Sequence, residues 1–264
     1  MENELLIRLG TFVGLFAVLA IVEAVMPRRK RAQPRQTRWT TNLSIIAIDT
    51  LTLRLMNILV PLLAVGAALD AASLGWGLFN MVALPVWIEV LATIVILDLA
   101  IWVQHLIFHK VPILWRLHRV HHADRDFDVT TALRFHPIEI AASMIIKIGA
   151  VYLLGAPALG VILFEVILNG SAMFNHANIR LPLGLDRVLR QIVVTPDMHR
   201  VHHSVHHDET DSNYGFCLSI WDRIFGTYTD QPRDGHDDMT IGLEWQNDDP
   251  SKLGWSLMLP FQRK

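Results

Sequence analysis

Long apolar stretches separated by short polar ones dominate the first two thirds of the chain. The first, Leu9 to Met26, contains one charged residue, Glu23. Together with Leu5 to Ile7 it provides about 20 residues, enough for a helix to cross a bilayer. Its cluster of positive charges follows the apolar stretch instead of preceding it, which is not the arrangement of a cleavable signal peptide. The pattern therefore predicts a membrane-spanning helix.

Two further stretches of the same kind follow. Leu43 to Leu69 is predicted to be a second span, although it contains Asp49 and Arg54, which lie five residues apart and do not share a helical face. Phe79 to Val103 is predicted to be a third span. If the N-terminus lies outside, three spans place the segment that begins at about Gln104 on the cytoplasmic side of the membrane.

A fourth apolar stretch, Ile138 to Asn169, is interrupted by Gly155-Ala156-Pro157. Because Gly and Pro end helices, this predicts a hairpin of two helices, and arms of about 17 residues leave open whether it crosses the bilayer fully. Leu181 to Val194 has an apolar face opposite Arg187 and Arg190. That pattern is typical of a helix in the membrane interface, with an amphipathic helix buried in a soluble cap as the alternative.

The polar segments suggest an orientation in the membrane. Arg28 to Arg38 holds six basic residues in eleven. It could be a solvated linker, but its place between two apolar stretches favours a cytoplasmic loop under the positive-inside rule. Asp70 to Gly77 contains no Lys or Arg, as expected of an outside loop. His199 to Lys264 is mostly polar and is predicted to be a cytosolic cap.

Composition narrows the class of protein. The 264 residues are 52% apolar and 18% charged, whereas typical soluble domains are roughly 45–50% apolar and 25% charged. The apolar content excludes intrinsic disorder, and the single cysteine, Cys217, excludes a disulfide scaffold. A net charge of −2 leaves no basic field for nucleic acid. We predict an all-α, polytopic integral membrane helical bundle with a cytosolic histidine-rich cap.

Thirteen histidines stand out in this chain. Ten of them lie in short motifs or beside the hairpin: His105, His109, His118, His121, His122, His136, His176, His199, His202 and His203. Two triplets share the spacing H-x-x-H-H, and because positions i, i+3 and i+4 lie on one helical face, each triplet can direct its imidazoles into one cavity. The adjacent His121 and His122 diverge by about 100°, which suits two neighbouring metals better than one. His206 and His207 are expected to be solvated, and His236 fits neither spacing.

The number of candidate ligands also favours two metals. A structural zinc takes four ligands, and ten clustered histidines exceed that more than twofold. The chain has no Cys ligand set, H-E-x-x-H or Glu-x-x-His pair, and imidazole suits Fe, Zn, Cu and Ni alike. Asp98, seven residues before His105 on the same helical face, is expected to accept the second ring N–H of a ligand histidine and fix its tautomer.

The histidine motifs resemble those of the membrane-bound fatty acid hydroxylase and sterol desaturase superfamily, over about Asp98 to Tyr228. Four further motifs carry the resemblance: Arg134-Phe135-His136-Pro137, Asn175-His176-Ala177-Asn178, Asn213-Tyr214-Gly215-Phe216 and Trp221-Asp222-Arg223-Ile224-Phe225-Gly226-Thr227-Tyr228. The resemblance implies that the ten histidines hold a non-haem di-iron centre, with Asp98 and Asn175 behind the ligands. Trp102 and Leu106 depart from the residues that the family often has there.

The resemblance further implies an enzyme, an O2-dependent lipid hydroxylase or desaturase, with its active site on the cytoplasmic face of the membrane. Its substrate would be an apolar lipid such as a sterol, fatty acyl or ether lipid chain. Hydroxylation and desaturation are not separable from the sequence, and hydroxylation is favoured as the more direct outcome. Expected divisions of the chain are N-terminal transmembrane helices with a basic loop (1–97), a fatty acid hydroxylase-like domain with the membrane hairpin 138–175 (98–230), and a C-terminal cytosolic tail (231–264).

Electrons are expected from a separate donor of ferredoxin or cytochrome b5 type with its reductase, because the chain has no b5-like haem domain, flavin motif or G-x-G-x-x-G. Four arginines near the histidines could dock such a donor or simply reflect the charge bias of the cytosolic side: Arg116, Arg119, Arg125 and Arg200. Two other functions remain open, a membrane metal-binding or transport protein that uses the same histidines, and a degenerate member retained as a lipid-binding scaffold. Histidines at segment ends disfavour a transport path, which needs ionisable groups near mid-membrane.

Overall fold

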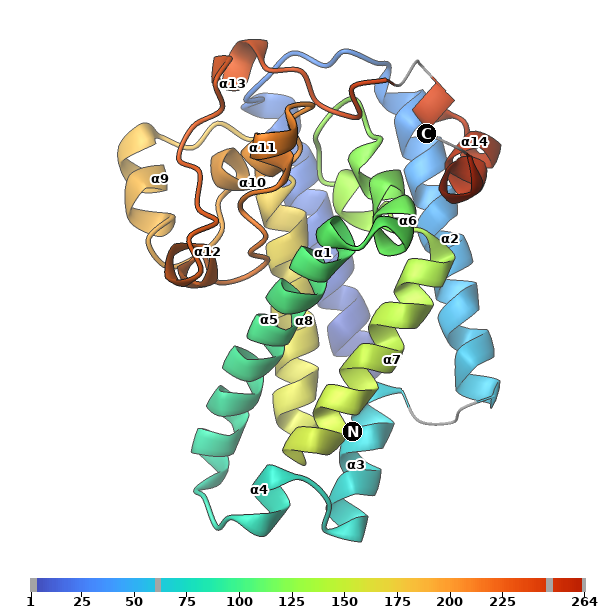
Figure 1. The fold of residues 1–264 in the computed structure, drawn as a ribbon, viewed down its shortest axis with the longest axis vertical. Coiled ribbons are helices and arrows are strands. Elements are labelled where there is room, and N and C mark those ends of the chain that lie inside the picture. Colours follow the sequence, from blue (N-terminus) through green and yellow to red (C-terminus); the bar gives the residue numbers. More distant parts are fainter. Residues whose placement is uncertain (1–3, 60–62, 246–248, 263–264) are drawn as a thin grey trace.

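The computed structural model describes residues 4–59, 63–245 and 249–262, and its regular structure is helical, with no strand among the described residues (Figure 1). The α-helices are α1 (Glu4–Val25), α2 (Arg35–Leu59), α3 (Ala64–Leu74), α4 (Leu78–Met81), α5 (Val86–Lys110), α6 (Pro112–His122), α7 (Pro137–Leu154), α8 (Ala158–Asn175), α9 (Leu183–Leu189), α10 (Pro196–His202), α11 (His207–Thr210), α12 (Ile220–Ile224), α13 (Gly235–Asp238) and α14 (Leu253–Met258). Three short 3-10 turns are η1 (Thr131–Leu133), η2 (Asp249–Ser251) and η3 (Leu259–Phe261). The all-α prediction is confirmed.

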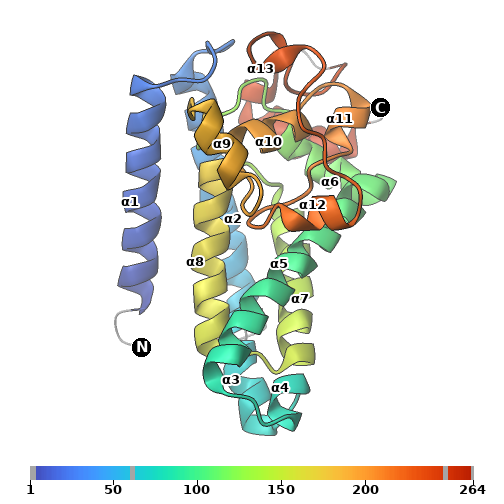
Figure 2. The same ribbon diagram turned by 90° about the vertical axis from the view of Figure 1, so that its left-hand side faces the viewer.

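Four of the described helices are long and apolar enough to cross a membrane: α1 from Arg8, α5, α7 and α8. Many of their large apolar side chains face outward, among them Ile21 at 63% and Leu153 at 79% exposure. Such exposure is unfavourable in water and is what a lipid-facing surface needs. Helix α8 packs against α1 and α5, and α7 packs against α2, α3 and α5, so the long helices stand side by side as a bundle (Figure 2). The predicted polytopic membrane bundle is confirmed.

The predicted hairpin is present as α7 and α8, which meet at Gly155 with φ +63°. A second glycine, Gly77 with φ +94°, lies against this turn from the loop between α3 and α4. A Cβ added at Gly77 would overlap the backbone of Gly155 and lie 2.5 Å from the carbonyl oxygen of Tyr152. Only glycine allows this approach, which ties the hairpin to the helices beside it.

The second predicted span was wrong in its extent. Instead of one helix over Leu43 to Leu69, α2 begins eight residues earlier at Arg35 and ends at Leu59, and a separate α3 begins at Ala64; the intervening residues 60–62 lie outside the described part of the chain. The physical reason is that the first half of α2 buries polar side chains, so hydropathy alone misses it. Asn42, for example, is fully buried and donates to Asp124.

The third span begins later and ends later than predicted. Helix α5 starts at Val86, directly after Pro85, and continues to Lys110, while Phe79 lies in the short α4. Proline fits the residues that start a helix because its missing N–H has no partner there. The extension at the other end carries His105 and His109 on a rigid helix instead of a loop.

A cap of short helices covers one end of the bundle, where α5 ends and α7 begins (Figure 1). Helix α9 is shorter than the predicted segment Leu181 to Val194, and its apolar side chains point outward, with Leu183 at 73% and Val188 at 67% exposure. This excludes the buried alternative for that helix. The C-terminal segment packs on the cap, with η3 against α6 and α14 against α2.

The basic loop also joins the cap. Arg38 is buried and donates to both Asp124, at 2.7 Å, and Asp128, at 2.6 Å. Arg29 donates to the carbonyl oxygen of Met239, and Arg28 pairs with Asp237. The loop is therefore bound to the cap and is not a solvated linker.

Candidate metal centre

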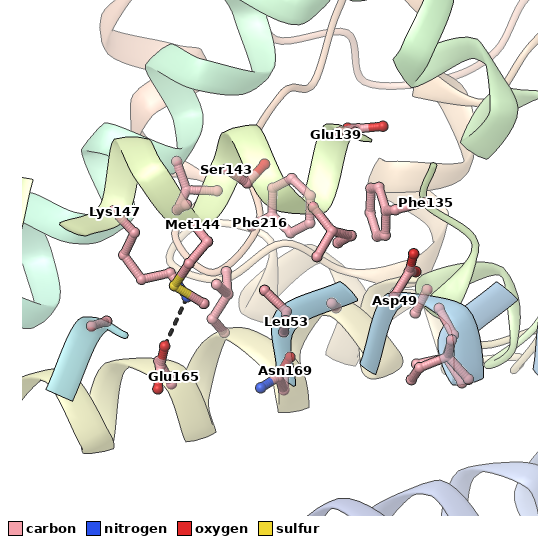
Figure 3. A pocket seen from close by; sticks show the side chains of 18 of the residues that line it. Asp49, Leu53, Phe135, Glu139, Ser143, Met144, Lys147, Glu165, Asn169 and Phe216 are labelled. Carbon is pink, nitrogen blue, oxygen red and sulfur yellow. Dashed lines mark hydrogen bonds and ion pairs between the residues drawn. The ribbon is translucent and has the colours of Figure 1, made fainter. Parts of the chain in front are cut away.

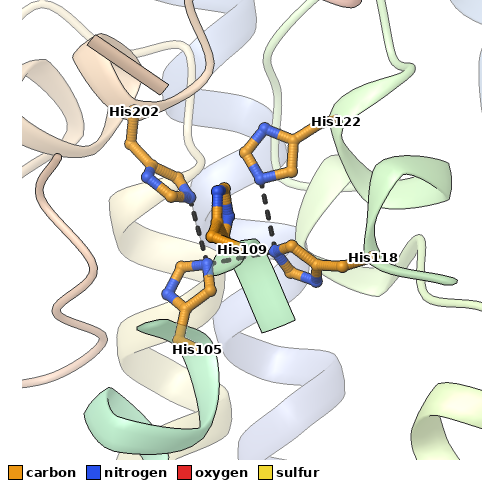
Figure 4. A group of neighbouring side chains, drawn as sticks. All are labelled: His105, His109, His118, His122 and His202. Atoms are coloured by element: carbon orange, nitrogen blue, oxygen red, sulfur yellow. Dashed lines mark hydrogen bonds between the residues drawn. The ribbon is translucent and has the colours of Figure 1, made fainter. Parts of the chain in front are cut away.

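Nine of the ten predicted ligands meet inside the cap in two groups. Each residue offers one ring nitrogen, and these atoms lie within 4.8 Å of one another in each group. The first group, drawn in Figure 4, is His105, His109, His118, His122 and His202, and the second is His121, His176, His199 and His203.

Four short pieces of chain position these rings. The end of α5 and the whole of α6 are joined through Val111, so that the motifs of the two helices face each other. The end of α8 supplies His176, and α10 with its C-terminal cap supplies the second triplet. His121 and His122 fall into different groups, as their divergence on the helix predicts.

The ring nitrogens that face one another are spaced as nitrogens bound to one metal ion would be. In the first group the Nε2 atom of His105 lies 3.1 Å from that of His118 and 3.0 Å from that of His202. In the second, the Nε2 atom of His176 lies 3.1 Å from that of His121 and 3.2 Å from that of His199. Two nitrogens bound at right angles, each at about 2.1 Å from one ion, lie about 3.0 Å apart. The residues present therefore fit one metal ion in each group.

Two nitrogens without partners support the same fit. The Nε2 atoms of His109 and His203 are buried, and neither has a hydrogen-bond partner in the described part of the chain. Leaving a buried polar group unsatisfied costs about 1–3 kcal/mol. A metal ion at each group would take these lone pairs.

The opposite nitrogen of several rings is held by the protein. The Nδ1 atom of His105 lies 2.7 Å from the carbonyl oxygen of Tyr214, and that of His202 lies 2.7 Å from the carbonyl oxygen of Ser212. A carbonyl oxygen can only accept, so both Nδ1 atoms carry the proton. The Nε2 lone pairs are thereby left to face the group, which is the usual way that a metal-binding histidine is oriented.

One ring is held by a carboxylate instead. The Nδ1 atom of His118 lies 2.6 Å from the Oε1 atom of Glu139, on α7. The sequence analysis missed Glu139, although a carboxylate within an apolar stretch is a general signal of a functional position. The second oxygen, Oε2, is buried and has no hydrogen-bond partner among the described residues.

Burial keeps these imidazoles neutral. It lowers the pKa of His118 to about 3 and that of His176 to about 4, from an ordinary value of 6.5. The pKa values of His199, His202 and His203 are also far below that value, for the same reason. Neutral imidazole is the form that binds metal, so the site is ready to take ions at neutral pH.

The loop that carries the Ser212 and Tyr214 carbonyls is fixed by two family motifs. Asn213 adopts the left-handed region with φ +50°, which Asn tolerates better than most residues, and its side chain bonds the backbone of Met198 and Thr229. Asp222 accepts from the backbone N–H groups of Tyr214, at 2.8 Å, and Gly215, at 2.9 Å. These contacts aim the two carbonyls at the rings of His105 and His202.

Trp102, one of the two departures from the family pattern, belongs to the same network. Its indole N–H donates to Asp222 at 3.0 Å, and its ring stacks on Phe225 at 4.6 Å between centroids. At this position Trp102 therefore donates a hydrogen bond to the carboxylate that holds the Tyr214 loop.

His136 is the predicted ligand that the structure does not bring to either group. It caps the start of α7, where its Nδ1 accepts from the backbone N–H of Ile138 at 3.2 Å. Its Nε2 lies 3.2 Å from the carbonyl oxygen of Leu257. Both ring nitrogens are thus engaged with backbone, and the residue joins α7 to α14.

The predicted hydrogen bond from a histidine to Asp98 is absent among the described residues, and the side chain of Asn175 bonds backbone. Among the hydrogen bonds of the described residues, Asp98 meets no histidine; it accepts from the Trp221 indole at 2.8 Å and from the backbone N–H of Leu218 at 3.2 Å. The Asn175 side chain donates to the carbonyl oxygen of Phe216 at 3.0 Å. Both residues hold the 216–221 segment, and neither is hydrogen-bonded to a histidine ring in the described part of the chain.

A cavity of about 880 Å³ lies between the first histidine group and the bundle helices. Figure 3 shows some of the side chains that line it. His105 and His118 form part of its wall at the cap. Aromatic and aliphatic side chains line much of the rest, including Phe108, Phe135 and Phe216. Its size and apolar lining are typical of a site for a lipid-sized ligand.

Two of the four arginines proposed to dock an electron donor are buried. Arg200 is fully buried and pairs with Asp197, and Arg119 donates to the carbonyl oxygen of Leu259 at 2.6 Å. Neither can meet a protein partner in this conformation. Arg116 and Arg125 remain partly exposed.

Comparison with known proteins identifies the family. The fatty acid hydroxylase family model matches residues 90–227, more than half of the chain. The chain belongs to the fatty acid hydroxylase family. This confirms the resemblance inferred from the motifs, and the matched range contains both histidine groups.

Several curated relatives in this family act on lipids by name. Ornithine lipid hydroxylase OlsE of Rhizobium tropici is 28% identical over 235 residues, which are 87% of this chain and 69% of the relative. Human alkylglycerol monooxygenase is 34% identical over 127 residues, 47% of this chain and 27% of the relative. Human cholesterol 25-hydroxylase is 27% identical over 140 residues, 53% of this chain and 50% of the relative. The chain thus spans half or less of the length of these two human enzymes.

The predicted enzyme class, an oxygen-dependent oxidoreductase, is confirmed by the family and by the names of these relatives. No solved structure matches the chain.

Proposed function

We propose that this protein is a membrane di-iron oxygenase that hydroxylates an apolar lipid with O2 and two electrons. The observation that carries the proposal is the meeting of two adjacent groups of buried histidines with an apolar cavity of about 880 Å³. Ligand type alone leaves the metal open, and the family resemblance favours iron. The relatives named above act on an ornithine lipid, an alkylglycerol and cholesterol, which supports a lipid substrate.

Five imidazoles would hold one iron and four the other, with positions left for O2. Two bound irons would supply the oxidation of an unactivated C–H bond. The chain itself binds and orients the substrate and keeps water away. His105 and Phe216 share one part of the cavity wall, with ring centroids 5.1 Å apart, so a hydrocarbon chain there would lie against a ligand ring.

We also propose that the cap and its metal centre lie on the cytoplasmic face of the membrane. The basic loop between α1 and α2 is at the cap end, as the positive-inside rule requires of a cytoplasmic segment. A lipid would then enter from the bilayer, while a separate donor of ferredoxin or cytochrome b5 type would approach from the cytosol. The partly exposed Arg116 and Arg125 are the candidate docking residues.

The test combines metal analysis with lipid analysis on the purified full chain. We expect two irons per chain, and incorporation of one atom from isotopically labelled O2 into a lipid when an electron donor is supplied. His202→Ala should reduce both, because it removes a ligand of the first group. Loss of two hydrogens without oxygen incorporation would make the reaction a desaturation.

Two results would contradict the proposal. Metal passage across sealed vesicles without lipid oxidation would favour the transport alternative. Lipid binding without bound iron would favour a scaffold. Lipid profiles of cells with the active chain and with His202→Ala identify the substrate.

A further inference from the structure

Two carboxyl groups in the cavity wall lack hydrogen-bond partners: those of Asp49 on α2 and Glu139 on α7. Asp49 is 5% exposed, and its Oδ1 atom is buried with no hydrogen-bond partner in the described part of the chain. Glu139 is 3% exposed; its Oε1 atom bonds His118, and its Oε2 atom has no such partner among the described residues. Helices α2 and α7 pack together, and the two side chains are close enough for their charges to interact. We call Asp49 and Glu139 the carboxyl pair.

A third oxygen without a partner lies in the same wall. The Oε1 atom of Gln104 on α5 is buried and has no hydrogen-bond partner in the part of the chain that the structure describes, while its Nε2 atom donates to Ser143 at 2.7 Å. Gln104 directly precedes His105, and Glu139 bonds His118, so both lie beside the first histidine group. The oxygens without partners therefore gather at the histidine end of the cavity.

The charges of the wall balance, so net charge does not select a ligand. Six charged side chains line the cavity, three basic and three acidic: Arg8, Arg54, Lys147, Asp49, Glu139 and Glu165. Glu165 pairs with both Arg8 and Lys147, and Figure 3 draws Lys147 and Glu165 on the opposite side of the view from Asp49 and Glu139. The carboxyl pair is distinguished by its missing hydrogen-bond partners and not by its charge.

The missing partners favour a ligand with a hydroxyl group. Nearly all buried polar atoms in proteins are hydrogen-bonded, so buried oxygens that face a cavity without partners point to a donor on a ligand. A hydroxyl both donates and accepts, so it can bind a carboxyl group that is ionised or protonated, whereas an ammonium only donates. A hydroxyl also adds no charge to a wall whose charges already balance.

We infer that the carboxyl pair binds a hydroxyl group of a lipid, whose hydrocarbon part contacts the aromatic and aliphatic side chains of the wall. The hydroxyl then lies at the histidine end, so the part of the lipid next to it lies closest to the first histidine group. Binding is independent of oxidation, whereas the identification of this lipid as the substrate rests on the proposed function. The competing explanation is that ordered water alone bonds the carboxyl pair.

Equilibrium binding to the purified full chain, without an electron donor, distinguishes these explanations. The probes are hexadecanol, methyl hexadecyl ether and hexadecylammonium, which share one hydrocarbon chain and differ in the polar group. Giving a buried acceptor its donor corresponds to about ten-fold or more in affinity, so the alcohol should bind that much more tightly than the ether. A gain for the ammonium without one for the alcohol would overturn the inference and indicate a cationic group.

Variants at Asp49 complete the test. Asp49→Leu should abolish the preference for the alcohol while retaining ether binding, which shows that the cavity is intact. Asp49→Asn should keep the preference, because an amide oxygen still accepts from a hydroxyl. Asp70→Leu is the matched control, since Asp70 lies on α3 of the bundle but bonds Tyr152 outside the cavity wall.

Three results would overturn the inference. The first is equal affinity of the unaltered chain for the alcohol and the ether. The second is a preference for the alcohol that survives in Asp49→Leu, and the third is a preference that is lost equally in Asp49→Asn.

Iron-loaded protein supplied with O2 and an electron donor separates this inference from the proposed function. A preference for the alcohol without any lipid oxidation would leave the binding site standing and refute the oxygenase. Oxidation of the alcohol and the ether in the same proportion by the unaltered chain and by Asp49→Leu would refute the binding mode and leave the oxygenase intact.

Discussion

At the scale of single residues, the candidate metal centre depends on which ring nitrogen of each imidazole, Nδ1 or Nε2, faces its group of histidines. The protein decides this by offering an acceptor to Nδ1, as Tyr214 does for His105 and Ser212 for His202. The carbonyl oxygen of Ala172 does the same for His176, so three rings are held by backbone carbonyls. The acceptor for His118 is different because it is the side chain of Glu139, so a substitution can remove it.

Glu139→Gln tests this orienting role. The amide keeps the shape of the side chain but replaces one carboxyl oxygen by an NH2 group, which cannot accept from the Nδ1–H of His118. We expect about 10- to 100-fold weaker retention of iron against a chelator, the usual loss when a group behind a metal ligand is changed. Iron content per chain after dialysis is the measurement. Glu89→Gln, on α5 outside the cavity, is the control and should retain iron normally; equal retention in both variants would remove Glu139 from the site.

The histidine spacing predicted most of the rings that meet in the two groups but could not exclude His136. Spacing shows which side chains share a helical face, and it correctly separates His121 from His122. It does not show that a ring caps the start of a helix, as His136 does for α7. Asp98 was misassigned for a similar reason, since its real partners, Leu218 and Trp221, are 120 or more residues away along the chain.

At the scale of elements, hydropathy located the helices that face lipid on most sides. It did not predict the bounds of α2. Helix α2 buries Arg38 and Asn42 against the cap, so its polar face is internal and its pattern is not that of a membrane span. Such pairing depends on Asp124 and Asp128, which lie more than 80 residues later. Their identity as partners cannot be derived from local sequence.

Arg38→Met should destabilise the fold strongly, by about 3–5 kcal/mol, because it leaves two buried carboxylates without their cation. Arg38 helps to lower the pKa of Asp124 from 3.8 to about 2 despite its burial. A carboxylate with a lowered pKa stabilises the fold above its unfolded pKa and loses that contribution as the pH falls through its folded pKa. The unaltered chain should therefore lose this contribution between about pH 4 and 2.

Thermal unfolding in detergent as a function of pH is the measurement. Arg38→Met should be less stable at pH 7 and should lack the stabilisation that the ion pair gives above pH 4. Arg180→Met, at an exposed arginine, should follow the unaltered chain. Equal stability of the two variants at pH 7 would show that the buried pairs contribute nothing.

The contact of Gly77 with Gly155 makes a separate prediction about the turn at the far end of the bundle. Gly77→Ala introduces a Cβ where the backbone of Gly155 lies, so the hairpin must move. Gly75→Ala carries the strain of the left-handed helical region, about 1–2 kcal/mol at its φ of +68°, and its Cβ would meet nothing within 4 Å. Gly77 has φ +94° and ψ 164°, a backbone conformation open essentially to glycine alone, so its substitution adds greater strain to the overlap. Gly77→Ala should thus lower the melting temperature clearly more than Gly75→Ala. Similar melting temperatures would mean that the turn is not packed as described.

At the scale of the whole molecule, the order of the helices places the cap, the basic loop and both histidine groups at one end of the bundle (Figure 2). The alternation of apolar stretches predicted this common end. It could not predict the cavity, which is formed by side chains from four or more helices that meet only in the folded bundle.

The orientation of that end in the membrane is testable by chemical labelling. Cys217 is buried, and burial raises the pKa of its thiol, so it will react slowly. Single cysteines are introduced at Asp237 on the cap and at Ser73 at the opposite end, both exposed. In sealed vesicles of known orientation, a membrane-impermeant maleimide should label Asp237→Cys only from the cytoplasmic side and Ser73→Cys only from the other side.

This outcome decides which electron donors can serve the enzyme, because a protein donor must reach the cap directly. Labelling of Asp237→Cys from the outer side would put both histidine groups out of reach of cytosolic reductases and contradict the positive-inside assignment. Labelling of both positions from one side would mean that the bundle does not span the bilayer, and the four lipid-facing helices would then need another apolar environment. Permeabilising the vesicles with detergent should allow the protected position to react as well. Such a gain of label separates a true side preference from a difference in reactivity.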